Sequence, residues 1–513
     1  MGLGNSNQIA KQLTPPALRA KRAYMLTNFL IIAGIGFALG AWVYSIAFLA
    51  LLVENHRFWK VHQKKPAPLA HTYARANIII PCKGMEHQLR ENLTAFMQQD
   101  HPNYEVTFVV ERADDTSVQL IRNVQKENRC VRSRLIVAGR TEQCGQKVHN
   151  LRSATAELSK EVDVLVFADS DASPKRTWLR WLVNSVGREG LGARTGYRWM
   201  VPKNKELPTL LGCTINNALA SFLGRGKHYL VWGGSWAIHR NVFDAVGIRE
   251  AWSGVLSDDL VATRALRSAS LDVEFEPQCV CTSAVEFTWA SLTEFLRRQL
   301  LISRRYAPFY WFSSLVVTTV ATIGFWGGLL AGIVGIAQGA SWGYWAFGSS
   351  VGLYLMGVAR AAIRQNIGRS NSPNWRGYRR AKKFDLFAGP LTTLVTNFML
   401  LMSTLGNTVT WRGIKYFVGR GGRVILVGRS MGDRPWPVNT QESPDPRTQA
   451  QKEQAKPAAP SYENGANRSH GISSSRVEQR VVPAPHFDSK SAKSPEANVN
   501  ANVRISRGSP SDN

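Results

Sequence analysis

The feature that most constrains this fold is an uncharged apolar segment near the N-terminus, residues 25–53, with the sequence MLTNFLIIAGIGFALGAWVYSIAFLALLV. A transmembrane helix needs about 20 predominantly apolar residues, so this segment is long enough to cross a bilayer with some tilt. The apolar region of a cleaved signal peptide, at about 7–15 residues, is much shorter. A buried core helix is the alternative. We expect a membrane span that follows an N-terminal tail of residues 1–24.

Three further apolar segments lie in the C-terminal half of the chain. Residues 311–337 and 344–361 are separated by a short turn and predict a helical hairpin. The third segment, residues 385–409, contains Gly389-Pro390 near its start and Gly406-Asn407 near its end. Because proline and glycine interrupt helices, we expect a transmembrane or interfacial helix here, and we favour the shallow, interfacial position.

The charges around these segments predict their orientation. Residues 360–383 carry eight basic side chains and no acidic one, which places this loop in the cytoplasm by the positive-inside rule. The hairpin then starts and ends in the cytoplasm, and residues 75–308 lie there too. The basic residues of the N-terminal tail argue mildly against the external N-terminus that this topology requires. The expected location is an inner or plasma membrane.

Composition excludes several classes of protein. Among the six cysteines only Cys279 and Cys281 are close together, which excludes a disulfide-rich secreted scaffold and fits a reducing, cytosol-facing location. The formal charge is +27, but the basic residues cluster beside apolar segments without an aromatic stacking platform, so we expect no nucleic-acid partner. Residues 435–513 are rich in Pro, Ser, Asn, Gln and Ala, and they are predicted to be disordered.

Residues 75–308 show the alternation of strands and helices that is typical of an α/β domain. This alternation predicts a mostly parallel sheet, in which ligands bind beyond the carboxyl ends of the strands. Asp169 and Asp171 directly follow one such strand. We expect strands at residues 77–80, 106–110, 135–138 and 162–168, and helices at residues 86–99 and 118–128.

The sequence Asp169-Ser170-Asp171 places two carboxylates on either side of one residue. Such a pair can hold a divalent cation against a diphosphate, because Mg²⁺ typically binds one or two carboxylates together with phosphate oxygens and water. The alternative is an ordinary turn in which Asp and Ser form local hydrogen bonds. The motif alone does not decide between the two.

The order of several short motifs is more specific than any one of them. In this order the chain resembles the inverting GT-A glycosyltransferases of the large family that includes cellulose and hyaluronan synthases. It is most similar to the ceramide glucosyltransferase branch and its hopanoid-associated bacterial relatives, over residues 30–416. The resemblance implies a Rossmann-like GT-A domain at residues 75–308. The motifs are IIIPCKG (78–84), Glu111, GQKVHNL (145–151), DSD (169–171), GGSWAI (233–238), LSDDL (256–260) and TWRG (410–413).

The resemblance also implies roles for individual residues. Glu111 would contact the uridine and Lys147 the nucleotide end of the donor. Asp169 and Asp171 would hold Mg²⁺ or Mn²⁺ and the diphosphate. Asp259 would be the general base, with Asp258 beside it. The ordinary alternatives are a strand-end acid, a surface lysine, and two acids that favour a helix N-terminus capped by Ser257.

One departure from the family pattern concerns the helix that enters the membrane. The family often has Gln-x-x-Arg-Trp there, whereas this chain has Leu301-Ile302 in place of Arg-Trp, with Arg298 at the first position. Gln299 and Arg304, together with Arg305, are near enough in sequence to supply the donor and the cation. Their alternative role is an interfacial basic cluster attracted to anionic lipid.

The resemblance implies a membrane-bound enzyme that moves one sugar from a UDP-sugar, UDP-glucose by analogy, to the hydroxyl of a ceramide-like or other lipid. The missing tryptophan and the few membrane segments favour single transfer over polymer extrusion. Two alternatives remain open: a processive polysaccharide synthase, and a catalytically inactive anchor that binds anionic lipid. The presence of Asp169, Asp171 and Asp259 argues against the inactive anchor.

Overall fold

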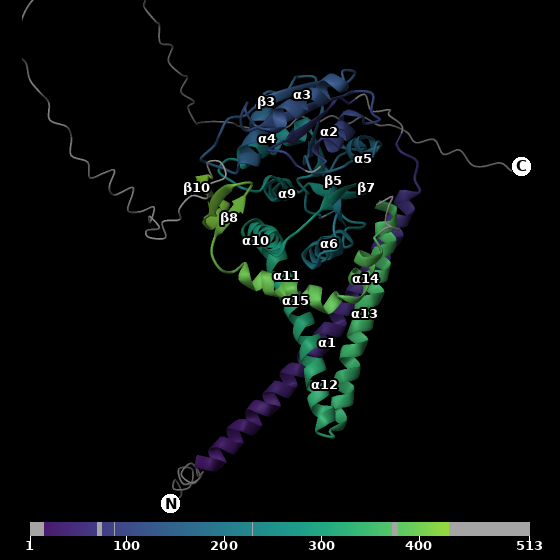
Figure 1. Ribbon diagram of the computed structural model, residues 1–513, viewed down its shortest axis with the longest axis vertical. Helices are drawn as coiled ribbons and strands as arrows, with labels where there is room; N and C mark the ends of the chain where they lie inside the picture. Colours follow the sequence, from purple (N-terminus) through teal and green to yellow (C-terminus); the bar gives the residue numbers. More distant parts are fainter. Residues whose placement is uncertain (1–14, 69–73, 87, 228, 372–377, 430–513) are drawn as a thin grey trace, which may run out of the picture. The chain divides into compact units, whose positions relative to one another are not determined.

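The computed structural model describes residues 15–68, 74–86, 88–227, 229–371 and 378–429. They form an α/β part around a seven-stranded sheet and a stem of long helices, drawn below it in Figure 1. The expected α/β class is confirmed. The disorder predicted for residues 435–513 concerns a segment outside the described residues.

The large sheet has the strand order β3-β2-β1-β4-β6-β5-β7. Four of its six neighbouring pairs are parallel, and only β6 runs antiparallel to both of its neighbours. The mostly parallel sheet predicted from the sequence is therefore present. Its strands are β1 (Ala76–Pro81), β2 (Tyr104–Val110), β3 (Arg132–Val137), β4 (Val164–Ala168), β5 (Leu191–Pro202), β6 (Ser235–His239) and β7 (Asp272–Val285).

Helices cover both faces of the large sheet. Successive strand residues point to opposite faces, so each strand contributes apolar side chains to both layers of helices. In β1, Ile79 packs into one apolar cluster, whereas Ile78 and Ile80 pack into another. The second cluster contains side chains of α2 (Leu89–Met97), α3 (Ser117–Glu127) and α5 (Trp178–Val183). The first contains side chains of α4 (Gln146–Ala156), α7 (Arg240–Ala245), α8 (Ile248–Ala251) and α9 (Asp258–Ser268).

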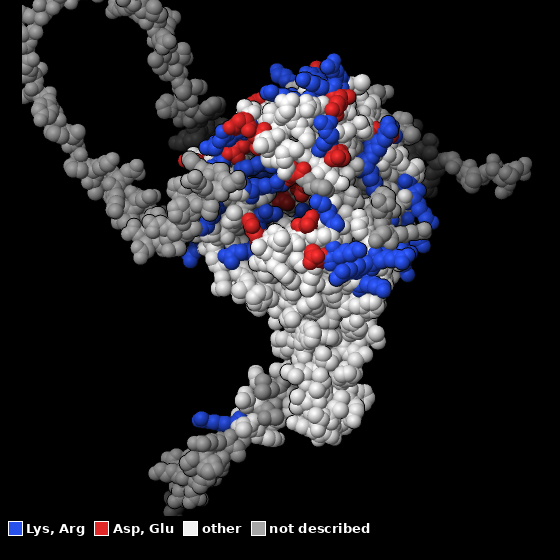
Figure 2. All heavy atoms as spheres, viewed as in Figure 1, with Lys and Arg blue, Asp and Glu red and all other residues white. Residues whose placement is uncertain are grey.

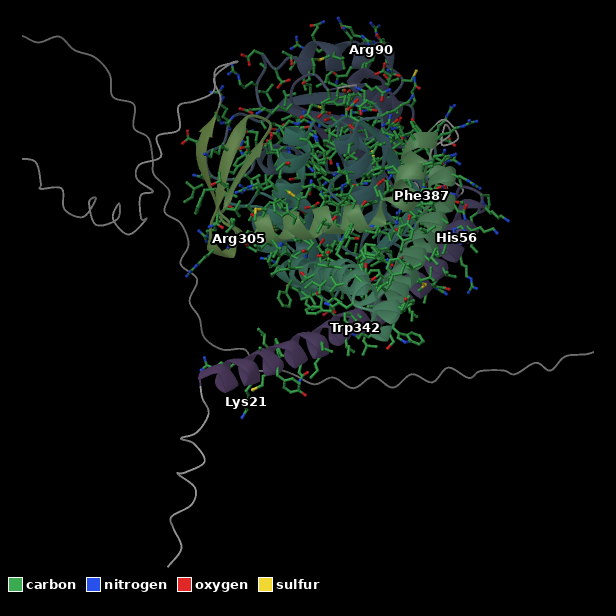
Figure 3. The ribbon with its side chains drawn as sticks, turned by 60° about the horizontal axis from the view of Figure 1, so that its bottom comes forward. Lys21, His56, Arg90, Arg305, Trp342 and Phe387 are labelled. Atoms are coloured by element: carbon green, nitrogen blue, oxygen red, sulfur yellow. The ribbon has the colours of Figure 1, made fainter. Side chains whose placement is uncertain are left out.

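The stem consists of the long α1 (Pro15–Gln63) and a helical hairpin. α11 (Pro308–Thr322) continues through a π-helical turn (Ile323–Gly327) into α12 (Gly328–Ala337), and α13 (Ser341–Asn371) returns beside it. Glycines allow the two arms to approach closely, since a Cβ on Gly332 would lie 2.6 Å from the Phe347 nitrogen. Figure 3 shows Trp342 at the tip of the hairpin.

Three helices in the described part are long and apolar enough to cross a membrane: Lys21–Gln63, Pro308–Ala337 and Ser341–Arg369. The third apolar segment instead forms two helices, α14 (Arg379–Phe387) and α15 (Gly389–Met402), which are bent by 75° at a break. α15 has 14 residues, about 21 Å at 1.5 Å per residue, whereas the hydrocarbon core is about 30 Å thick. α15 alone is too short to span it.

A second, antiparallel sheet packs on the α/β part, and the sequence did not predict it. Its strands are β8 (Thr408–Trp411), β9 (Ile414–Val418) and β10 (Val424–Arg429). The hydroxyl of Tyr416 accepts a hydrogen bond from the Gln146 backbone at 3.2 Å, and the Val424 backbone donates to the Gly254 carbonyl at 2.9 Å. These contacts fasten the C-terminal sheet over the start of α4.

Some helix boundaries differ from those expected. α1 begins at Pro15, inside the segment expected as a tail, because proline fits the first turn of a helix. α2 begins at Leu89 rather than near residue 86, since Gln88 has a left-handed backbone conformation with φ 58°. α13 extends to Asn371, so part of the segment 360–383, expected as a loop, is helical.

The remaining helices connect the sheet to the stem. α6 (Leu207–Ala220) follows β5, and α10 (Trp289–Tyr306) follows β7 and leads into α11. The Asn397 amide of α15 donates to the hydroxyls of Thr318 and Thr319 in α11, at 3.1 and 2.8 Å. These polar contacts hold α15 across the top of the stem (Figure 1).

Candidate active site

A cavity of about 1310 Å³ is lined both by the large sheet and by the stem helices. Ligand pockets in proteins typically measure about 300–1,000 Å³, so this one has room for more than one small molecule. Figure 2 shows acidic side chains recessed in a hollow of the α/β part, with Lys and Arg around them. We call the wall that carries Lys147, Asp169, Asp171, Asp258 and Asp259 the polar end of the cavity.

β5, α10 and the second sheet also line the cavity, and a further, mostly apolar part of its wall is formed by α1, α6, α11, the π-helical turn, α13, α14 and α15. We call this mostly apolar part the apolar end. Figure 2 shows the adjoining stem almost free of charged side chains. The apolar end also contains one ion pair, in which Arg364 Nη2 lies 2.6 Å from Asp385 Oδ1. Its apolar side chains include Tyr44, Leu219, Phe325, Leu353, Leu386 and Leu400.

Lys147 is the centre of the polar end. It is the second residue of α4, and its Nζ lies 2.8 Å from Asp169 Oδ1 and 3.2 Å from Asp258 Oδ1. Burial alone would lower the pKa of Lys147, but the nearby Asp169, Asp258 and Asp259 raise it above its ordinary value. The positively charged side chain of Lys147 therefore links Asp169, which follows strand β4, to Asp258, which begins helix α9.

Asp258 and Asp259 are the first two residues of α9, and they have different environments. Ser257 caps the helix, as predicted, by accepting a hydrogen bond from the Leu260 backbone. Asp259 Oδ1 accepts from the Ser257 hydroxyl at 2.6 Å, and Oδ2 accepts from the Gly233 backbone at 3.2 Å. Asp259 is half-buried and lines the cavity, so its carboxylate is accessible from there.

Asp258 is almost fully buried. Its Oδ2 has no hydrogen-bond partner among the described residues, and burial raises the pKa of Asp258 to about 7 although Lys147 opposes this rise. Asp258 lines the cavity, but its Oδ2 is covered and its Oδ1 lies 3.2 Å from Lys147 Nζ. The geometry gives Asp258 the role of holding Lys147 in place.

Two glycines allow the backbone before β6 to approach these side chains. A Cβ on Gly233 would lie 2.7 Å from Asp258 Oδ2 and 2.9 Å from Lys147 Nζ. A Cβ on Gly234 would lie 2.7 Å from Asp169 Oδ2. Any larger residue at either position would displace the polar end, which accounts for the Gly-Gly pair in the GGSWAI motif.

Asp169 and Asp171 follow β4, as predicted, and both line the cavity. Lys147 pairs with Asp169, whereas no basic nitrogen in the described part lies within 4 Å of the Asp171 carboxylate. Burial, followed by the charge of Asp169, raises the pKa of Asp171, and Arg198 and Lys147 oppose this rise. Asp171 therefore has an unneutralised carboxylate that faces the cavity.

The two carboxylates fit a divalent cation only in combination with a substrate. No group of three or more His, Cys, Asp and Glu side chains in the described ranges is placed to hold a metal ion alone. Mg²⁺ is often bound by one or two carboxylates together with phosphate oxygens and water. The Asp169–Asp171 pair has this donor chemistry, and substrate phosphate would have to complete the coordination.

Glu111 lies next to the polar end but behind its wall. Its carboxylate is buried and pairs with Lys83 at 2.9 Å, with Arg140 at 3.4 Å, and with Arg429 of the second sheet. Lys83 lines the cavity, whereas Glu111 does not. Arg429 also donates to Gln146 Oε1 at 2.7 Å. Sequence reasoning missed Arg429 because it lies beyond the motifs of the resemblance.

The residues expected to replace the missing Arg-Trp pair are separated in the structure. Gln299 lines the cavity. Arg304 instead donates to the Thr404 and Gly406 carbonyls and to Asn407, and Arg305 also donates to Asn407. Figure 3 shows Arg305 at the end of α15 that is remote from Phe387, beside the second sheet. Both arginines thus fasten the segment between α15 and β8, outside the cavity lining.

These motifs, with the sheet and the cavity that they build, correspond to a known family. Residues 42–424 match glycosyl transferase family 21. The chain belongs to glycosyl transferase family 21. It is therefore a glycosyltransferase, and its resemblance to the ceramide glucosyltransferase branch is confirmed.

Individual proteins that are similar to this family 21 chain share low sequence identity with it. Ceramide glucosyltransferase 3 from Caenorhabditis elegans is 28% identical over 169 residues, which are 31% of this chain and 36% of that protein. The match thus spans little more than a third of that relative.

Two solved structures are similar to the chain at low identity. The mannosyltransferase PcManGT from Pyrobaculum calidifontis, in complex with GDP-Man and Mn²⁺, is 16% identical with a TM-score of 0.37 and covers 71% of this chain and 99% of its own. Glucosyl-3-phosphoglycerate synthase from Mycobacterium tuberculosis, in complex with Mn²⁺ and UDP-glucose, is 15% identical with a TM-score of 0.30 and covers 46% and 79%.

Proposed function

We propose that this family 21 enzyme transfers a single sugar from a UDP-sugar to the hydroxyl of a lipid, with inversion at the anomeric carbon. The observation that carries the proposal is the continuity of the cavity. One space is lined by the carboxylates and Lys147 of the polar end and by the apolar side chains of the stem helices. An apolar acceptor can therefore enter from the membrane side and present its hydroxyl to charged groups.

The polar end is proposed as the site of the donor. Lys147 supplies a fixed positive charge for the diphosphate, and Asp169 and Asp171 would hold Mg²⁺ or Mn²⁺ there. When bound, the metal supplies Lewis-acid stabilisation of the departing diphosphate. Glu111, which three cations hold in its orientation, lies behind Lys83, where it would reach the uridine only through movement of these cations.

Asp259 is proposed as the general base. The acceptor hydroxyl attacks the anomeric carbon, its proton passes to the accessible Asp259 carboxylate, and UDP leaves from the opposite face. Ser257 and the Gly233 backbone orient this carboxylate through the hydrogen bonds described above. No covalent intermediate is needed, and Asp258 contributes by holding Lys147.

The stem is proposed to anchor the enzyme in the membrane, with the catalytic domain in the cytoplasm, where UDP-sugars are made. The charge bias of residues 360–383 supports this side. The short, bent α14–α15 pair is proposed to lie in the interface. In sealed vesicles of known orientation, a cysteine introduced at Ser430 should then be protected from an impermeant maleimide whenever the exposed Cys130 of the catalytic domain is protected.

Thin-layer analysis of membrane lipids tests the proposed function directly. Membranes with the wild-type chain, supplied with a panel of labelled UDP-sugars, should form one labelled glycolipid, and membranes with the Asp259→Asn variant should form none. A labelled polymer would instead identify a processive synthase. Absence of any labelled product with every sugar, from protein that still binds UDP, would favour the inactive anchor.

A further inference from the structure

Two arginines from different elements line the cavity beside one aromatic ring, that of Phe295. Arg198 is on β5 and Arg298 is on α10, and both line the cavity. The guanidinium carbons of Arg198 and Arg298 lie 5.2 and 5.7 Å from the centre of the Phe295 ring. Arg298 also lies 5.3 Å from the centre of the Trp411 ring, which β8 contributes. The sequence motifs did not indicate Arg198 at all.

Neither guanidinium forms an ion pair with a described residue. No carboxylate in the described part lies within 4 Å of either, although Glu294, Asp171 and Asp169 are near enough to attract Arg298. The only hydrogen bond made by the Arg198 side chain to a described residue runs from Nε to Asn216 Oδ1, at 3.1 Å. Burial, and then the charge of Arg198, lowers the pKa of Arg298. The two positive charges thus repel each other, and a bound anion would remove this unfavourable electrostatic energy.

The aromatic rings hold both cations in a fixed arrangement. A guanidinium within about 6 Å of a ring centre is attracted by the negative face of the aromatic ring. Phe295 is shared by the two arginines, and Trp411 confines Arg298 from the side of the second sheet. Among the described residues, the terminal nitrogens of both side chains have no hydrogen-bond partner.

We propose that Arg198 and Arg298, held by Phe295 and Trp411, form a phosphate-binding site separate from the Lys147 cluster. Paired planar guanidiniums suit phosphate because each can donate two parallel hydrogen bonds to its oxygens. The proposal rests on the proposed function, since the phosphate belongs either to the diphosphate of the donor or to the head group of a phosphate-bearing acceptor lipid. Arg198 and Trp411 also supply the cation and the aromatic ring that residues 301–302 lack.

Binding measurements on the full-length chain in nanodiscs of neutral lipid test this site without any turnover. Three labelled probes are compared: UDP, short-chain phosphatidic acid, and the matching diacylglycerol, which lacks only the phosphate. The variants are Arg198→Gln, Arg298→Gln and Arg198→Lys. Arg249→Gln is the matched control, because Arg249 also stacks on a phenylalanine, 5.8 Å from the centre of Phe243, but lies outside the cavity lining.

The expected result is a ten- to hundredfold loss of affinity for one phosphate-bearing probe, or for both, in the two glutamine variants, the size expected for lost charge-assisted hydrogen bonds. Arg198→Lys should recover part of the loss, and Arg249→Gln should bind like wild type. Weaker UDP binding alone assigns the site to the donor, and weaker phosphatidic acid binding with unchanged diacylglycerol binding assigns it to the acceptor.

The proposal is overturned if the glutamine variants, with thermal unfolding like that of wild type, bind both phosphate probes with unchanged affinity. It is also overturned if diacylglycerol binding falls as much as phosphatidic acid binding, since the arginines would then only shape the cavity. If a glutamine variant fails to fold, the comparison of Arg198→Lys with wild type decides in the same way. A wild type that binds the probes but transfers no sugar would refute the proposed function and leave this site intact.

Discussion

The polar and apolar ends of the cavity use charge in opposite ways. At the polar end, Lys147 contacts two carboxylates, while Asp171 has no basic partner among the described residues and can interact with a ligand. At the apolar end, Arg364 and Asp385 are almost buried and, among the described residues, form an ion pair only with each other. Charges at the first end therefore serve binding and chemistry, whereas charges at the second serve the packing of α13 against α14. A substitution at the polar end should therefore lower binding or turnover, whereas a substitution at the apolar end should lower stability.

The largest effect is expected from Asp259→Asn, at the polar end. Loss of a general base typically lowers turnover about 10²–10⁴-fold, and the amide keeps the shape of the side chain. UDP binding and thermal stability should change little. Turnover of the purified enzyme is measured beside Asp244→Asn, which removes a surface carboxylate paired with Arg240. Equal turnover in wild type and Asp259→Asn would refute the assignment of the base.

A substitution at the apolar end should instead lower stability and leave turnover nearly unchanged. Asp385→Asn leaves the Arg364 guanidinium without a charge partner, and breaking a buried pair in this way costs about 3–5 kcal/mol. The melting temperature in detergent should fall clearly, while turnover of the protein that remains folded stays near wild type.

A matched control separates burial from the mere loss of a salt bridge. Glu54→Gln removes the exposed pair between Glu54 and Arg57, which are 3.9 Å apart on α1. Exposed pairs contribute about 0–1 kcal/mol, so this variant should melt close to wild type. If Asp385→Asn instead lowers turnover without a change in melting temperature, the ion pair at the apolar end contributes to binding or chemistry. The proposed difference between the two ends would then be wrong.

The contrast between the two ends also explains what the sequence could predict. Strands of a parallel sheet end at one edge, so residues that follow them, such as Asp169, meet there whatever the details of packing. The cap at Ser257 and the pair after it could be found in the same way, from local chemistry.

The remaining features depend on contacts between segments that are far apart in the chain. Trp411 and Arg429 reach the cavity or its wall only because the second sheet packs on the α/β part, and Arg198 of β5 contacts Phe295 only because α10 packs beside that strand. The Arg304 guanidinium could bind phosphate, but it instead donates hydrogen bonds to the carbonyls that follow α15. No spacing in the sequence distinguishes these two uses of an arginine.

An intermediate effect is expected from loss of the metal ligands. Asp171→Ala should weaken UDP binding in the presence of Mg²⁺ or Mn²⁺ by about ten- to a hundredfold, the equivalent of one or two charge-assisted contacts. With EDTA, wild type should fall to the level of the variant, because both then lack the cation. Binding of phosphate-free diacylglycerol at the apolar end should be unaffected. Full wild-type activity in EDTA would exclude a metal requirement.

The smallest effect is expected from removal of the C-terminal tail. Within the described part of the chain, both ends of the cavity are built from residues up to Trp411 and Tyr416, and Arg429, the last described residue, supports them through its contacts. The segment from about residue 435 has no apolar periodicity and no family motif. A stop codon after Trp436 should therefore leave specific activity within about a factor of two and the melting temperature unchanged, because exposed termini rarely contribute to stability. A stop codon after Gly419 is the matched control: it removes β10 with Arg429, and it should lower both quantities. Loss of expression or activity in the shorter deletion would mean that the tail packs on the enzyme and that the cavity has a third supporting element.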